Sequence, residues 1–70
     1  MGVYIMKTMK KYTFEEWKEK FKNRATVSCG IHYEDGWTCT ACFERYMNVV
    51  HDIEFFMKDH GNVAYIVSTK

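Results

Sequence analysis

The sequence predicts a small α+β domain built as a two-layer sandwich, with two helices on one face of a mainly antiparallel sheet. Its 70 residues suffice for one domain. Two segments repeat apolar residues at helical spacing, and two segments between them alternate at the period of a strand. A short apolar run follows the second helix, so the expected order of elements is (β)αββαβ. The elements are expected at residues 3–9, 13–23, 27–33, 37–43, 44–60 and 63–67.

The first element is the one that the sequence defines least. We expect residues 1–11 to form either an arm or the first strand, and residues 12–70 to form a single α+β domain. If Val3 to Met9 form a strand, the order of elements is that of the ferredoxin-like fold. Without that strand, the sheet has three strands and the same two helices.

The first helix has two start signals. Thr13 and Glu16 make the S/T-x-x-E capping box, in which each side chain accepts a hydrogen bond from the other residue's backbone N–H. Tyr12 and Trp17 occupy the two positions of a hydrophobic staple. We expect the helix to end near Asn23. Its apolar face carries Phe14, Trp17 and Phe21.

The next two segments form a β-hairpin whose register follows from the apolar pattern. A three-residue loop at 34–36 places both apolar sets on one face of the sheet, whereas a two-residue loop splits them between the two faces. Gly36 then lies where such a loop needs a left-handed residue. The expected cross-strand pairs are Tyr33 with Trp37, Ile31 with Cys39, Cys29 with Ala41, and Val27 with Phe43.

The second helix is expected to begin at Phe43 or Glu44 and to end at His60, with Gly61 at the C′ position. Val63 to Val67 is continuously apolar, which indicates a well-covered strand. The residues expected between the helices and the sheet are Phe14, Trp17, Phe21, Val27, Ile31, Phe43, Val50, Ile53 and Phe56. The opposite face of the sheet is expected to carry Ser28, Gly30, His32, Thr38, Thr40 and Cys42.

Composition and charge exclude several classes of protein. The 47% of hydrophobic residues excludes a disordered chain, and so small a core leaves little volume for a catalytic cleft. Three cysteines are an odd number, and no signal peptide is recognisable, which indicates free thiols in a reducing, cytoplasmic compartment. No apolar run is long enough to span a membrane. The net charge of the chain is +1, but its first part is basic, because residues 1–24 hold seven Lys or Arg and only three Glu.

The cysteines suggest a metal site as an alternative interpretation of the hairpin. Cys29-x2-His32 and Cys39-x2-Cys42 supply the number and type of ligands of a zinc site. The second pair also has the spacing of a redox CxxC, but it lacks the preceding βαβ context of that motif. The hairpin register directs Cys29 and Cys39 to one face and the other two ligands to the opposite face. We therefore expect no metal, with zinc at these four residues as the alternative.

The sequence favours a binding protein over an enzyme. No residues have the spacing of a catalytic triad, an acid–base pair or a phosphate-binding loop. We expect a small regulator or inhibitor that docks on a larger protein partner, of the kind that phages and other mobile elements encode. The alternative is a zinc-stabilised module, or a nucleic-acid-binding module that uses the basic start of the chain. An exposed sheet edge at the last strand would also allow a homodimer. The expected partner-binding residues are His32, Thr38, Thr40, Cys42, Lys18 and Lys22.

Overall fold

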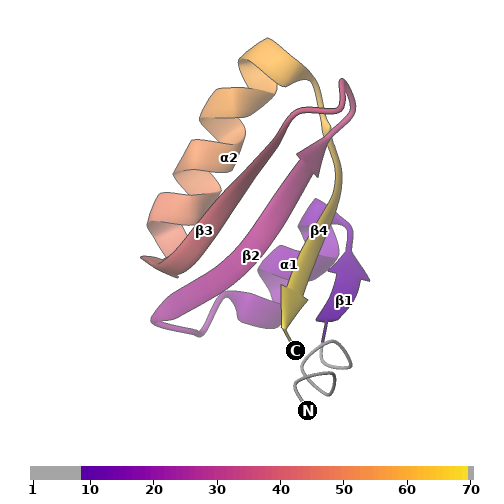
Figure 1. The fold of residues 1–70 in the computed structure, drawn as a ribbon. Coiled ribbons are helices and arrows are strands. Elements are labelled where there is room, and N and C mark those ends of the chain that lie inside the picture. The colour runs from indigo at the N-terminus through magenta and orange to yellow at the C-terminus, as the bar shows by residue number, and fades with distance from the viewer. Residues whose placement is uncertain (1–8, 70) are drawn as a thin grey trace.

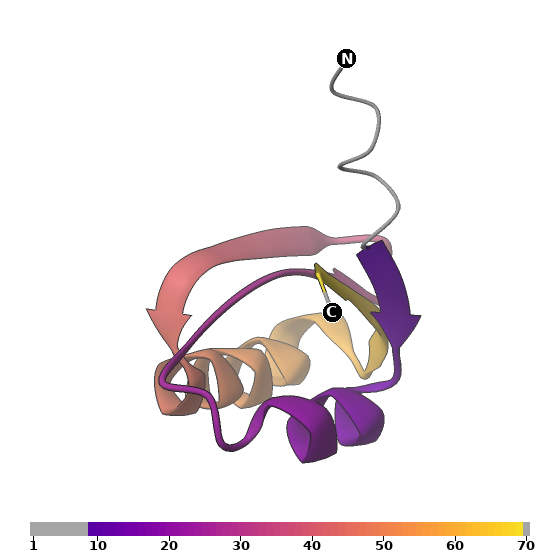
Figure 2. The same ribbon diagram turned by 90° about the horizontal axis from the view of Figure 1, so that it is seen from below.

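A computed structural model describes residues 9–69 and confirms an α+β domain with the element order βαββαβ. Both helices lie on the same side of the sheet, as Figure 2 shows from below. The other side carries no helix or strand from the described residues. The elements (Figure 1) are β1 (Met9–Tyr12), α1 (Phe14–Phe21), β2 (Thr26–Tyr33), β3 (Thr38–Arg45), α2 (Tyr46–His60) and β4 (Val63–Thr69).

The four strands form one antiparallel sheet in the order β1-β4-β2-β3 (Figure 1). The ferredoxin-like fold shares the order of elements but places its first and third strands at the centre of the sheet. Here β4 and β2 are central, and β1 and β3 are the edges. The expectation of an exposed edge at the last strand is therefore wrong, because β4 pairs with β1 on one side and with β2 on the other.

The structure describes strand β1 from Met9, the first of the described residues, to Tyr12. The expected strand at residues 3–9 lies outside the described residues apart from its last member. Within β1, Lys11 pairs with Val67 of β4. The next residue, Tyr12, turns to the helix layer, where its ring meets the ring of Phe21 edge to face at 5.8 Å. This aromatic contact partly buries Tyr12, whereas the other three residues of β1 are exposed.

The predicted capping box at the start of α1 is confirmed. The backbone N–H of Glu16 donates to Oγ1 of Thr13 at 3.1 Å, and the backbone N–H of Thr13 donates to Oε1 of Glu16 at 2.9 Å. The helix ends at Phe21 with Lys22 as its C-cap, slightly before the expected end at Asn23. The cap matters because so short a helix has few internal hydrogen bonds of its own.

The loop of the hairpin has the predicted length and register. The backbone N–H of Tyr33 donates to the carbonyl of Trp37 at 2.9 Å, which closes the loop. Gly36 has a φ of 94°, the left-handed conformation that a three-residue loop requires. The pairs Cys29 with Ala41 and Ile31 with Cys39 are confirmed.

The other end of the hairpin departs from the expected register. Val27 pairs with Glu44 instead of Phe43, because a β-bulge falls between Val27 and Cys29. Phe43 adopts a φ of 52°, and its backbone N–H donates to Oγ of Ser28 at 2.9 Å. The Phe43 side chain is 83% exposed. The expectation that Phe43 packs between the two layers is therefore wrong.

The bulge also moves the start of α2. The helix begins at Tyr46, after the expected start at residue 43 or 44, because β3 continues to Arg45. The backbone N–H of Tyr46 donates to the carbonyl of Ala25, which ties the start of α2 to the loop before β2. The other end agrees with the sequence: Gly61 follows His60 with a φ of 85°.

The core lies between the helices and the sheet and has an aromatic centre. Trp17 is fully buried, with its ring stacked on Phe21 at 5.7 Å and on Tyr46 at 5.4 Å, so it joins α1 to α2. Apart from Phe43, every residue predicted between the layers is buried or packs against the core. The buried apolar residues are Trp17, Phe21, Val27, Cys29, Ile31, Tyr33, Ala41, Val49, Val50, Ile53 and Ile66.

Candidate docking surface

The face of the sheet opposite the helices is formed by alternate residues of all four strands. Directly opposed residues in neighbouring strands share a face, so the pairing register defines rows of side chains. One row runs from Lys11 through Val67 and Gly30 to Thr40. We call the whole surface the open face. It comprises Met9, Lys11, Ser28, Gly30, His32, Thr38, Thr40, Cys42, Tyr65 and Val67.

An aromatic stack lies at the centre of the open face. His32 of β2 pairs with Tyr65 of β4, and their rings stack with centroids 4.4 Å apart and planes inclined by 16°. On Tyr65 lies the ammonium of Lys11, 4.5 Å from the ring centroid. A cation over a tyrosine ring is attracted by the ring's quadrupole. These contacts join Lys11, Tyr65 and His32 into one cluster on the open face.

Beside this stack the open face has a hollow of about 390 Å³. Its floor is low because Gly30 has no side chain, and a Cβ added there would meet no atom within 4 Å. Met9 and Val67 give it apolar walls. The hollow has the size to accept one or two apolar side chains of a binding partner. It is lined by Met9, Ser28, Cys29, Gly30, His32, Thr40 and Val67.

Only part of the predicted partner-binding set lies on this surface. His32, Thr38, Thr40 and Cys42 belong to the open face. Of the two predicted lysines, Lys18 is on α1 and Lys22 is its C-cap, so both belong to the helix layer on the other side of the sheet. Both form ion pairs with glutamates of α1. The pairs join Lys18 to Glu15 at 3.4 Å and Lys22 to Glu19 at 3.0 Å.

Four residues of the open face, on the two strands that follow β2 in the sheet, were not predicted from the sequence. Met9 and Lys11 come from β1, and Tyr65 and Val67 come from β4. A period of two within the apolar run from Val63 could have separated Tyr65 and Val67 from the buried Ile66. The pairing of β1 with β4 had no local signal in the sequence.

The cysteines occupy both faces of the hairpin, in agreement with the predicted register. Burial raises the pKa of the Cys29 thiol to about 12 and also raises the pKa of Cys39. Cys42 is exposed, and all three thiols are free. Within residues 9–69, no three His, Cys, Asp or Glu side chains come together in a group that could hold a metal ion. The buried thiol of Cys29 is in an environment that disfavours the thiolate needed for ligation or redox chemistry.

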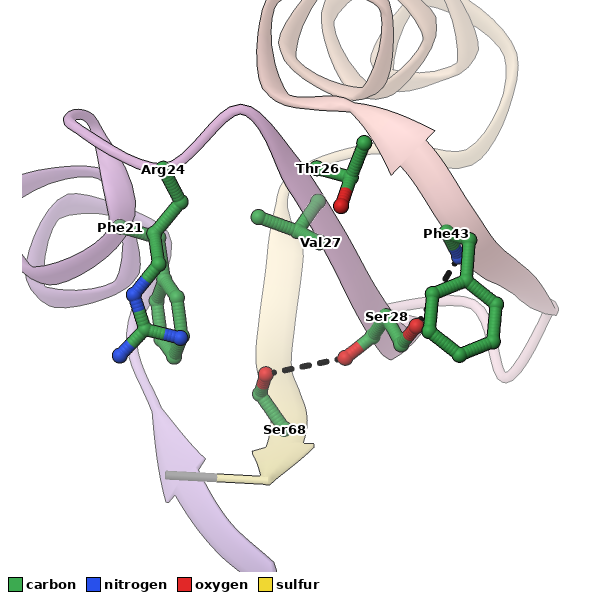
Figure 3. Close-up of a pocket in the computed structure, with 7 residues that line it drawn as sticks. All are labelled: Phe21, Arg24, Thr26, Val27, Ser28, Phe43 and Ser68. Carbon is green, nitrogen blue, oxygen red and sulfur yellow. Dashed lines mark hydrogen bonds between the residues drawn. The ribbon is translucent and has the colours of Figure 1, made fainter.

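A second, smaller hollow of about 170 Å³ lies at the bulge (Figure 3). The hydroxyl of the buried Ser68 donates to the carbonyl of Ser28 at 3.1 Å, and the hydroxyl of Ser28 accepts from Phe43. The guanidinium of Arg24 lies over the ring of Phe21, 4.9 Å from its centroid. These hydrogen bonds hold the bulge in shape, so the polar groups here have a structural role.

One ionisable pair connects the hairpin loop to the end of α2. Nδ1 of His60 lies 2.7 Å from Oδ2 of Asp35, and the imidazole stacks on Trp37 with ring centroids 4.1 Å apart. The pKa of Asp35 is lowered, first by the hydrogen bond from the backbone N–H of Trp37 and then by His60. The backbone N–H of Glu34 donates to the carbonyl of Asn62 at 2.9 Å. The Asp35–His60 pair and this backbone hydrogen bond therefore hold the hairpin loop against the end of α2.

The described residues form a small α+β domain whose two helices both lie on one face of the sheet. Comparisons with protein-family models, curated proteins and solved structures found no match to this chain. None of the helices in the described part of the chain is long and apolar enough to cross a membrane.

Proposed function

We propose that this protein is a non-enzymatic regulator or inhibitor that docks on a larger protein partner through the open face. The observation that carries the proposal is the hollow beside the His32–Tyr65 stack, an apolar depression with polar residues around it. Depressions of this kind are typical of protein-binding surfaces. The proposal includes a cytoplasmic location, which the three free cysteines support.

The charges of the open face favour an acidic partner surface. Lys11 is its one lysine, and no carboxylate belongs to it. Electrostatic complementarity therefore favours a partner that places an apolar side chain in the hollow and a carboxylate near Lys11. We expect the partner surface to be acidic around an apolar centre.

The contacts of the basic residues favour a protein partner over a nucleic acid. Single-stranded nucleic acid is bound by a row of cations along its backbone and by aromatic rings with free faces. On the open face, the Tyr65 ring stacks with His32 and lies under the ammonium of Lys11. In the helix layer, Lys18 and Lys22 form ion pairs with glutamates. The Tyr65 ring and these three lysines are thus engaged in contacts within the domain, which favours a protein partner over a nucleic acid.

A capture experiment with matched variants tests this function. The full chain, its Val67→Glu variant and its Ala64→Glu variant are immobilised and exposed to lysate, since Val67 lies on the open face and Ala64 is exposed elsewhere on β4. We expect one protein to be retained by the wild type and the Ala64 variant. With that protein purified, calorimetry should show at least a tenfold loss of affinity for Val67→Glu, because a carboxylate then opposes the acidic partner.

Two results would contradict the proposal. One is equal affinity of the purified partner for the wild type and for Val67→Glu, with both variants shown by circular dichroism to be folded. The other is retention that disappears after nuclease treatment and falls steeply with salt, which is the behaviour of a nucleic-acid-binding protein.

A further inference from the structure

The outer side of β3 carries unpaired backbone groups. Within residues 9–69, β3 pairs with β2 alone and forms the edge of the sheet (Figure 1). Tyr33 and Trp37 form a hydrogen-bonded pair, and the alternation of an antiparallel ladder assigns Cys39 and Ala41 to the same side. The backbone N–H and C=O groups that point away from β2 are consequently those of Thr38, Thr40 and Cys42.

From Thr38 to Cys42, this edge lacks the charges and prolines by which proteins protect an exposed strand. The β-bulge, another protecting feature, lies at the end of this stretch beside Phe43. Lysines, prolines and very short strands prevent edges from pairing with other chains. The other edge, β1, has four residues and includes Lys10 and Lys11. In contrast, the stretch from Thr38 to Cys42 contains no charge and no proline, and three of its five residues are exposed. The lysines of β1 therefore disfavour pairing with another chain, whereas the stretch from Thr38 to Cys42 of β3 has no charge that would prevent it.

We propose that β3 pairs with β3 of a second copy of this chain, antiparallel about a two-fold axis at Thr40. In this register Thr40 faces Thr40 of the second copy, Thr38 faces Cys42, and Cys39 faces Ala41. All outward-pointing groups of the stretch are then paired, in about six backbone hydrogen bonds. The opposed side chains are small and uncharged, and a threonine pair is a favourable cross-strand neighbour. The stretch is thus complementary to itself.

The symmetry determines the shape of the dimer. A two-fold axis that relates antiparallel neighbours in one sheet stands perpendicular to that sheet, so the two sheets join into one and keep their faces. Both open faces then lie on one side and all helices on the other. A dimer would offer the two hollows to the same partner surface, which raises avidity when that surface repeats. The pairing itself does not depend on the proposed docking function.

Substitution of Thr40 by residues of opposite charge tests both the pairing of the two β3 strands and its register. Two variants of the full chain, Thr40→Lys and Thr40→Glu, are compared with the wild type by sedimentation velocity under reducing conditions over a range of concentrations. We expect the wild type to form dimers as the concentration rises. Each variant should stay monomeric, because like charges then face each other across the axis. An equal mixture of the two variants should form dimers again, since opposite charges meet.

Two controls distinguish loss of the dimer interface from loss of the folded structure. Ala64→Lys adds the same charge on β4, on the far side of β2, and should dimerise like the wild type. Circular dichroism should show the same secondary structure in every variant. A wild type that stays monomeric at the highest concentration would overturn the proposal, as would a single Thr40 variant that dimerises. Failure of the mixed variants to associate would overturn the register and with it the proposal.

Discussion

At the scale of single residues, Phe43 explains where the hairpin departs from its pattern. Its φ of 52° places a residue with a Cβ in the left-handed region, and its side chain is 83% exposed. A non-glycine residue in that region costs about 1–3 kcal/mol. The hydrogen bond from its backbone N–H to Ser28 helps to hold the conformation. The free-energy cost of the backbone strain at Phe43 is therefore offset little by burial of its side chain.

We predict that Phe43→Gly raises the free energy of unfolding by about 0.5–1 kcal/mol, because glycine enters the left-handed region without strain. Chemical denaturation at low protein concentration measures the change. Phe43→Ala is the matched control: it removes the same ring but keeps a Cβ, so its stability should not rise. A loss of stability in the glycine variant would mean that the ring of Phe43 packs against the domain.

The three thiols should differ in reactivity according to their surroundings. Thiolate is the reactive form, and burial raises the pKa of Cys29 to about 12, whereas Cys42 is exposed. We predict that a thiol reagent at neutral pH modifies Cys42 first, Cys39 more slowly, and Cys29 only on unfolding. Peptide mass spectrometry over time gives the order, and denaturant should make the rates equal. Modification of Cys29 as fast as Cys42 would contradict the burial of Cys29.

At the scale of elements, the caps and alternations in the sequence predicted most of the structure. The capping box of α1, the loop at Gly36 and the end of α2 at Gly61 were all predicted, because each depends on a few neighbouring residues. The bulge was not predicted. It follows from a contact between Ser28 and Phe43 on different strands, and apolar alternation in either strand gives no sign of it.

The capping box should contribute measurably to the stability of α1. We predict that Thr13→Ala lowers the free energy of unfolding by about 1 kcal/mol, since the N–H of Glu16 loses its acceptor. Thr13→Ser keeps the hydroxyl and should remain close to the wild type. Thermal and chemical denaturation measure both variants. Equal losses for alanine and serine would show that the methyl group, and not the hydroxyl, stabilises the helix start.

The tie between the hairpin loop and α2 should depend on pH. The pKa of Asp35 is lowered in the fold, so its charged form stabilises the native state above its ordinary pKa, and this contribution disappears as pH falls through the folded value. Because asparagine keeps an oxygen for the N–H of Trp37, Asp35→Asn isolates the charge. We predict that the wild type melts higher than Asp35→Asn above about pH 5 and that the gap narrows as the pH falls below the ordinary pKa of aspartate.

Asp59→Asn provides the control for that pH series, because Asp59 is an exposed carboxylate in the same turn of α2 as His60. Its melting temperature should follow the wild type across the range. A gap between the wild type and Asp35→Asn that widens toward acid would reverse the expected sign and contradict the role of the Asp35 charge.

At the scale of the whole molecule, the order of the strands was beyond sequence reasoning. The apolar run of β4 predicted a covered strand but not its neighbours, and the insertion of β4 between β1 and β2 decides which residues share the open face. His32, Thr38, Thr40 and Cys42 were predicted from the hairpin alone. Their partners on β1 and β4 depend on long-range pairing, which leaves no mark in the local pattern.

The whole fold depends on the packing of Trp17, which joins α1 to α2 through Phe21 and Tyr46. Removing a buried tryptophan costs about 3–5 kcal/mol, and a domain of this size has a total stability of about 3–5 kcal/mol. We predict that Trp17→Ala is unfolded at room temperature, with a collapsed amide dispersion in NMR spectra.

The control is Trp17→Phe, which keeps an aromatic ring. The indole N–H is buried and has no hydrogen-bond partner among the residues that the structure describes, so its removal offsets part of the lost packing. Trp17→Phe should therefore remain folded and lose about 1–2 kcal/mol. A folded Trp17→Ala would show instead that the sheet and one helix suffice for a stable domain.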